Sequence, residues 1–128
     1  MDVKSTAEQL FFTTVRIEAK CNSSQLSVGT GFIFSYMNQE VVYPFLVTNK
    51  HVVKDKTEGT LYFIAADGDE PRLGSGHYVD SPDFESGWFG HPEETIDVAI
   101  TPFEPIHKHI RERGHSIFFK TVGIEITP

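Results

Sequence analysis

Apolar and polar residues alternate clearly near the start of the chain. Between residues 11 and 19, Val15 and Ile17 fall on one face, and Arg16 and Glu18 fall on the other. Successive side chains of a strand point to opposite faces, so a period of two residues is typical of a half-buried strand. This pattern predicts a first strand over residues 11–19.

Further short runs rich in β-branched and aromatic residues follow, separated by turn residues. They cover residues 28–36, 41–47, 59–66, either 76–79 or 88–89, and 96–101. No helical pattern lies between them. Six short strands joined by turns predict an all-β antiparallel fold, either a barrel or a sandwich.

Glycine and proline mark special positions within these strands. Gly29 and Gly31 share one strand face, which indicates a bend or a close approach of another part of the chain. Pro44 interrupts the third strand, and because proline has no N–H to donate, it predicts an edge or a bulge. Residues 67–69, Asp-Gly-Asp, predict a tight turn.

The pattern changes after residue 104. Residues 105–114 begin with a proline, end with a glycine and carry basic residues near the end, all of which are helix boundary signals. Ile106 and Ile110 lie four residues apart and form the expected buried stripe. The tail, residues 117–128, returns to an extended pattern.

The net negative charge of the chain limits the classes of molecule that it is expected to bind. The chain has 128 residues and a net charge of −7, and nine of its 18 acidic residues lie between Asp67 and Asp97, where Arg72 is the only base. A phosphate backbone would be repelled by such a surface, so we expect no nucleic-acid partner. The acidic stretch is typical of solvated loops, and a preference for basic substrates is the alternative.

The compartment is predicted from cysteine content and hydropathy. Cys21 is the single cysteine, which excludes an internal disulfide and favours a reducing compartment. No apolar stretch precedes Leu10, and no run of about 18 apolar residues occurs, so we expect neither a signal peptide nor a membrane span. We therefore expect a cytoplasmic protein.

A histidine and an aspartate stand out by their positions. His51 follows a strand-like run in FLVTNKHVVK, directly before two valines, and such a histidine serves either packing or catalysis. Asp97 is embedded in the apolar run TIDVAI, where a buried carboxylate needs a hydrogen-bonding partner. A Ser-His-Asp hydrolase requires such a pair, and histidine before aspartate is the chymotrypsin order.

Three segments carry a family resemblance. GTGFIFSY (29–36), FLVTNKHVV (45–53) and TIDVAITPF (95–103) resemble the first half of a trypsin-like serine peptidase of the bacterial trypsin-like peptidase domain type. The resemblance covers nearly the whole chain. It implies a six-stranded antiparallel β-barrel, one lobe of a double barrel, with His51 as general base and Asp97 as the carboxylate that orients it.

The nucleophile of that family is not found in this sequence. The family's serine lies in a Gly-x-Ser-Gly motif of a second barrel; Ser75 lies between the histidine and the aspartate, and Ser116 lacks the following glycine. We therefore expect residues 1–104 to form the N-terminal lobe and residues 105–128 to lead toward a missing C-terminal barrel. Alone, the chain is expected to be inactive.

Two functions from different classes remain open. In the first, the chain is half of a serine endopeptidase that hydrolyses protein or peptide substrates through an acyl-enzyme. In the second, it is a non-catalytic binding or assembly module, which self-associates through the face that a second barrel would cover.

A metal site and a cofactor are not expected. His107, His109, Glu112 and His115 contain metal-ligand residue types. Residues two apart on a helix face different directions, however, and no paired carboxylate stands at ligand spacing. No cofactor motif occurs.

Overall fold

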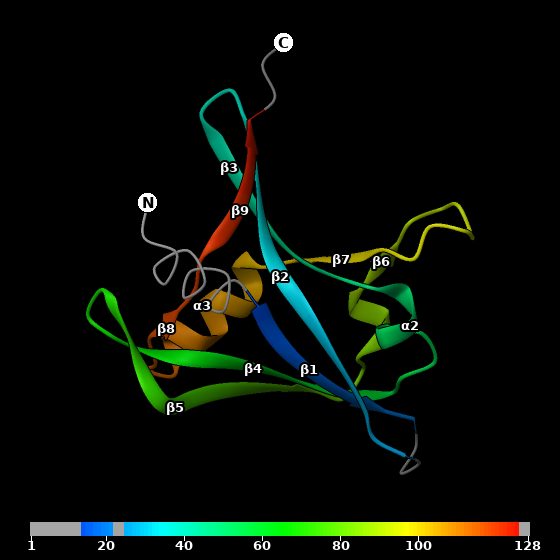
Figure 1. The fold of residues 1–128 in the computed structure, drawn as a ribbon, viewed down its shortest axis with the longest axis horizontal. Coiled ribbons are helices and arrows are strands. Elements are labelled where there is room, and N and C mark those ends of the chain that lie inside the picture. The colour runs from blue at the N-terminus through cyan, green and yellow to red at the C-terminus, as the bar shows by residue number, and fades with distance from the viewer. Residues whose placement is uncertain (1–13, 22–24, 126–128) are drawn as a thin grey trace, which may run out of the picture.

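A computed structural model describes residues 14–21 and 25–125, which form one mostly antiparallel β-sheet with short helices (Figure 1). The strands are β1 (Thr14–Lys20), β2 (Ser27–Asn38), β3 (Val41–Thr48), β4 (Glu58–Asp67), β5 (Glu70–Ser81), β6 (Phe89–Gly90), β7 (Ala99–Pro102), β8 (Ile117–Phe118) and β9 (Thr121–Glu125). The helices are α2 (Lys50–Val53), the 3₁₀ turn η1 (Glu85–Gly87) and α3 (Glu104–Glu112).

The hydrogen-bonded order of the sheet is β5-β4-β1-β2-β3-β7-β6, with β8 beside β4 and β9 beside β2. The two outermost strands, β5 and β6, do not pair with each other within the described residues, so the sheet is open. The predicted all-β class is therefore confirmed, whereas closure into a six-stranded barrel is not.

The alternation of apolar and polar residues in β1 shows which face of this strand is buried in the core. Val15, Ile17 and Ala19 are buried in β1, whereas Thr14 and Arg16 are exposed. Residues 11–13 of the predicted first strand lie outside the described residues. The buried side chains of β1 belong to one hydrophobic core with apolar residues from later parts of the chain. These include Ile33, Leu46, Leu61, Phe63, Phe84, Ala99, Phe103, Ile110 and Ile117.

The other predicted strands are found with different lengths. The runs 28–36, 41–47 and 59–66 are confirmed as β2, β3 and β4. Both candidate positions of the fifth strand are extended, in β5 and β6, and β5 begins six residues earlier than 76. The last run, 96–101, is shorter than predicted, because β7 begins only at Ala99.

Glycine and proline act as the sequence predicts. A Cβ on Gly31 would lie 2.7 Å from the carbonyl oxygen of Val47, so only glycine allows this approach of β3. Pro44 pairs with Ser35 in the β2–β3 ladder without a bulge, and it lies just outside the β3–β7 ladder, which begins at Phe45, so β3 is an edge at this residue on the β7 side only. Gly68 has a φ of +64° in the turn between β4 and β5.

The segment after residue 104 belongs to the same sheet and core. Thr14, the first residue of β1, pairs with Phe32, and Thr121, the first residue of β9, pairs with the next residue, Ile33. β9 thus lies on the same edge of β2 as β1, directly beyond the end of β1, and its direction is opposite to that of β1. This is the one parallel pair among the described strands.

The predicted helix is present as α3 and ends in a Schellman motif. Ile110 is buried and Ile106 half-buried, as the predicted stripe requires. Gly114 has a φ of +78°, its N–H donates to the carbonyl of Arg111 (2.9 Å), and the N–H of His115 donates to that of Ile110 (3.2 Å). Glycine adopts this left-handed conformation without strain, so it reverses the chain toward β8.

One histidine of α3 lies among aromatic rings of the core. The His107 ring stacks on Phe103 with 5.4 Å between centroids, and Phe119 meets its face edge-on at 5.2 Å. Burial lowers the pKa of His107, the Arg111 guanidinium lowers it further, and the Glu104 carboxylate opposes both.

A histidine with a lowered pKa makes stability depend on pH. In the unfolded chain His107 binds a proton below about pH 6.5, whereas in the folded chain it does so only at a lower pH. The free energy of unfolding should therefore fall as pH drops from about 7.5 to about 5.5. The slope from this group is at most about 1.4 kcal/mol per pH unit. Urea unfolding across this range should show the slope reduced in His107→Gln and kept in His91→Gln, a change at an exposed histidine. Equal slopes would contradict this assignment.

Candidate active site

His51 lies on α2, a single helical turn that follows β3. Val52 and Val53 are buried at 7% and 5% exposure and fix this turn against the core, which confirms that these valines serve packing. At the end of β3, the hydroxyl of buried Thr48 donates to the carbonyl of Thr30 on β2 (2.7 Å). The imidazole itself points outward, with 72% of the side chain exposed.

Glycine on β2 makes room for the turn that bears the histidine. A Cβ on Gly29 would lie 2.7 Å from Cγ2 and 2.8 Å from Cγ1 of Val52. These distances are shorter than van der Waals contact, and both branches of a stiff, buried valine are involved. The absence of a side chain at residue 29 therefore sets how closely α2 approaches the sheet.

Replacing Gly29 by alanine is expected to push α2 outward and to lower the free energy of unfolding by about 1–3 kcal/mol, the usual cost of overpacking a core. Chemical denaturation measures this change. Gly87→Ala is the matched control, because no atom lies within 4 Å of a Cβ placed there. If both variants were equally stable, the contact between residue 29 and α2 would not constrain the turn.

Strand register explains why Asp97 meets His51. In the β3–β7 ladder Thr48 pairs with Ala99. The chain leaving β3 and the chain entering β7 therefore start from adjacent points, and His51 and Asp97 lie within three residues of that pair. The sheet brings together two residues that are 46 positions apart in sequence.

The two predicted site residues are in direct contact. The Nδ1 atom of His51 lies 2.5 Å from Oδ2 of Asp97, and the backbone N–H of His51 donates to Oδ1 at 3.0 Å. An ionised carboxylate only accepts hydrogen bonds, so Nδ1 carries the proton and Nε2 presents its lone pair to solvent. This is the tautomer that a general base requires.

Electrostatics at the pair favours the ionised aspartate. The side-chain hydrogen bond from His51 holds the pKa of Asp97 below its usual range, and the backbone amides of His51 and Lys50 act in the same direction. Burial opposes this effect only in part. Over the pH range in which a histidine acts as a base, Asp97 is therefore negatively charged.

One expectation about Asp97 was wrong. The sequence pattern placed it inside a buried strand, yet 46% of its side chain is exposed. The physical reason is that β7 begins at Ala99, so Asp97 and Val98 still belong to the loop that enters the sheet. Hydrogen bonds from His51 on α2 stabilise its carboxylate, although the carboxylate is not buried.

Two neighbours of His51 hold the loop of Asp97 and were missed from the sequence. The Asn49 side-chain amide donates to the backbone carbonyl of Asp97 (3.0 Å), and the Lys50 ammonium donates to that of Glu93 (2.8 Å). Both residues stand directly before His51 in FLVTNKHVVK. Two long polar side chains between a buried strand and a buried valine pair were the signal that could have identified them.

Neither candidate serine approaches the pair. Ser75 lies on β5, at the opposite end of the strand order from β3 and β7, and Ser116 lies between α3 and β8. Within residues 14–21 and 25–125, no hydroxyl group hydrogen-bonds the His51 ring. The described residues thus bring a histidine and an aspartate into contact, with no serine hydroxyl bonded to that histidine.

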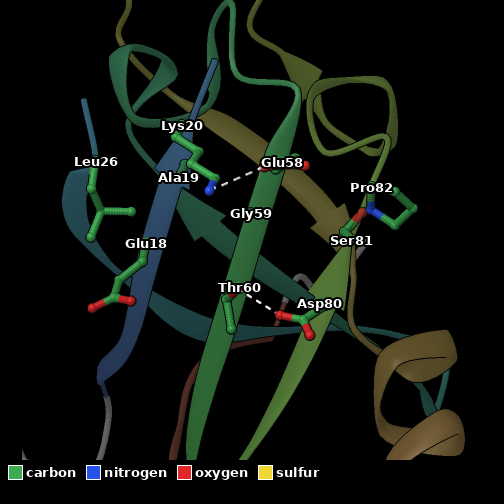
Figure 2. A pocket seen from close by; sticks show the side chains of 10 residues that line it. All are labelled: Glu18, Ala19, Lys20, Leu26, Glu58, Gly59, Thr60, Asp80, Ser81 and Pro82. Atoms are coloured by element: carbon green, nitrogen blue, oxygen red, sulfur yellow. Dashed lines mark hydrogen bonds and ion pairs between the residues drawn. The ribbon is translucent and has the colours of Figure 1, made fainter. Parts of the chain in front are cut away.

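A hollow of about 380 Å³ lies elsewhere, over β1, β4 and β5. Figure 2 shows Glu18, Thr60 and Asp80 projecting from these three strands, with the Thr60 hydroxyl donating to Asp80 (2.7 Å) and Lys20 paired with Glu58 (3.5 Å). Neither His51 nor Asp97 lines it. Of the three carboxylates that line it, only Asp80 belongs to the acidic stretch of residues 67–97, whereas Glu18 and Glu58 come from β1 and β4.

The metal-ligand residue types in the described part of the chain form no metal site. Across the described residues, no group of three or more histidine, cysteine, aspartate or glutamate side chains is placed to hold a metal ion. Nor does any helix in this part of the chain have the length and apolar character that crossing a membrane demands.

Comparison of the chain with protein-family models, curated proteins and solved structures finds no match. The contact between His51 and Asp97 is therefore the observation from which a function has to be inferred.

Proposed function

We propose that this chain is one lobe of a trypsin-like serine endopeptidase and supplies the general base and the orienting carboxylate of a Ser-His-Asp triad. The observation that supports this proposal is the hydrogen bond from His51 Nδ1 to Asp97 Oδ2 at 2.5 Å. The open sheet would correspond to the barrel of that lobe. The single cysteine favours a reducing compartment such as the cytoplasm.

The geometry suits a base that takes a proton and returns it. Two hydrogen bonds from His51, one from the ring and one from the backbone, use both oxygens of Asp97. The carboxylate thereby fixes the ring orientation and stabilises the imidazolium that forms when Nε2 takes a serine proton. Nε2 would later give this proton to the leaving amine, while the serine holds the acyl group.

In this proposal the serine and the oxyanion-hole amides come from a second lobe of the same polypeptide, which docks over the pair. The exposure of the two side chains, 72% and 46%, supports this view, because catalysis requires exclusion of water. Two apolar side chains are also exposed, namely Val98, which follows Asp97, at 38% and Phe89 on β6 at 64%.

A fluorophosphonate probe tests the proposal on the full-length product of the gene. Such probes modify only a serine that a neighbouring base has activated. We expect one labelled serine outside residues 1–128, in a Gly-x-Ser-Gly segment, and loss of labelling in His51→Ala. Ser75 and Ser116 should remain unlabelled in the chain of 128 residues.

Folded full-length protein that takes up no probe would overturn the proposal, as would labelling that survives His51→Ala. Either result would favour the second function, a non-catalytic assembly module. Light scattering of the same samples then distinguishes the two, because the module is expected to self-associate as its concentration rises.

A further inference from the structure

A second cavity, of about 230 Å³, is lined by basic side chains. It lies between β5 and the end of α3. Four basic residues surround it, namely His77, His109, Arg113 and His115. Tyr78 and the apolar residues Val79 and Ile110 complete the wall, and no carboxylate lines it.

The fold places these residues by two local devices. His77 lies on β5, opposite Phe63 of β4. The Schellman motif at Gly114 then turns the chain so that the His115 ring stacks on the His77 ring, with 4.1 Å between centroids and 22° between planes. His109 lies on α3, and Arg113, four residues later, directly follows the last residue of this helix, so the two side chains lie near the same end of one helix face.

Two of the basic side chains of this cavity lack partners in the part of the chain that the structure describes. Among the described residues, neither Arg113 nor His109 makes a side-chain hydrogen bond or an ion pair. Arg111, two residues away on the other face of α3, is paired with Glu104 (2.9 Å) and contacts His107. In a chain of net charge −7, an unneutralised basic cavity is a notable exception.

The titration of His77 agrees with this picture. Burial lowers its pKa first, and the neighbouring His115 lowers it further. No carboxylate contributes in the other direction, in contrast to His107, where Glu104 does. An anion that entered the cavity would supply the missing counter-charge for His77 and His115 together.

We propose that this cavity binds a tetrahedral oxyanion, the phosphate group of a small ligand, held by Arg113 and by protonated His77, His109 and His115. The guanidinium offers paired donors that fit two oxygens of a phosphate group, and imidazolium rings donate to the remaining ones. A phosphate group carries more oxygens and more negative charge than a carboxylate, so it can engage more of the four basic side chains that line this cavity. This site does not depend on the proposed peptidase function.

Binding is expected to strengthen as pH falls. The charged groups that face the cavity are His77 from β5, His109 and Arg113 from α3, and His115 from the following turn. Arginine stays charged, whereas an imidazole ring becomes a cation with two donors only when it is protonated, which low pH favours. Sulfate is the first probe, because its charge stays constant in this range and the pH dependence then reports the protein alone.

The experiment follows the histidine ring resonances of the chain by NMR during titration with sulfate, at about pH 6 and about pH 8. We expect saturable shifts of His77 and His115, and affinity at least about tenfold weaker at the higher pH. Inorganic phosphate should bind at the same rings, and phenyl phosphate distinguishes a free ion from an ester. Tighter binding of the ester identifies an organic phosphate as the ligand.

Arg113→Gln should weaken sulfate binding about tenfold or more, since it removes a charge-assisted contact. Arg111→Gln is the matched control, because it removes the same charge from the same helix outside the cavity. Equal affinity in the two variants would overturn the proposal. So would identical shifts with chloride at the same ionic strength, because charge screening alone would then explain them. Thermal unfolding shows that both variants are folded.

Discussion

Replacing Asp97 by asparagine is expected to lower the kcat of the proposed peptidase by about four orders of magnitude, with a much smaller change in KM. The amide group of asparagine would donate to Nδ1 of His51, where the carboxylate now accepts at 2.5 Å. The ring proton then moves to Nε2. A histidine in that tautomer has no lone pair left to accept the proton of a serine.

The measurement is kcat and KM of the full-length variant on a peptide substrate, together with the Nδ1–H resonance of His51 in the chain itself. Glu94→Gln is the matched control. It removes the same charge from the same loop, at an exposed residue three positions before Asp97. If Asp97→Asn kept its kcat, or if Glu94→Gln lost as much activity, Asp97 would have no orienting role.

The largest effect on stability is expected for Phe103→Ala. Phe103 is 1% exposed and contacts three rings, with centroids 5.9 Å away for Phe63, 5.1 Å for Phe119 and 5.4 Å for His107. Truncation to alanine leaves a cavity that elements from both halves of the chain surround. We expect a loss of about 3–5 kcal/mol in the free energy of unfolding.

Urea unfolding measures this loss, and Phe89→Ala is the matched control. The same number of atoms is removed there, but the Phe89 side chain is 64% exposed, so the expected change stays within about 0.5 kcal/mol. Similar losses in both variants would mean that the ring cluster around Phe103 contributes no more to stability than a surface residue does.

Local patterns predicted the elements of the fold well where one strand face is buried. Val15 and Ile17 alternate with Arg16 and Glu18 because one side of β1 faces the core, and the structure shows that burial. β5 was harder to delimit, since most of its residues are at least partly exposed and their pattern therefore carries little information about burial. The four-residue helix α2 is too short to show a helical period.

Which strands pair with one another could not be predicted from the alternation of apolar and polar residues. The extended character of the tail is confirmed up to residue 125, and residues 126–128 lie outside the described part of the chain. Nothing in the pattern indicates that β9 pairs with β2 in parallel. Alternation says which face of a strand is buried and does not name its neighbour. The exposure of Asp97 was missed for a related reason. Its apolar neighbours suggested a strand that already includes Asp97, whereas β7 begins two residues later, at Ala99.

The candidate pair was identified from residue types and chain order, and its contact follows from the β3–β7 register. The position of Asn49 and Lys50 directly before His51 could have marked them as candidates. The carbonyl groups that they bind depend on the path of the loop before Asp97, which the amino-acid pattern does not encode.

The parallel pairing of β9 has a consequence for synthesis of the protein on the ribosome. Ile33 and its partner Thr121 are 88 residues apart, so most of the chain must be translated before this row of the sheet can form. Until then, the edge of β2 beyond Phe32 lacks its β9 neighbour while the hairpin with β3 can already close. Nascent chains are thus exposed to pairing with one another at this edge, and slow elongation late in the message would prolong that interval.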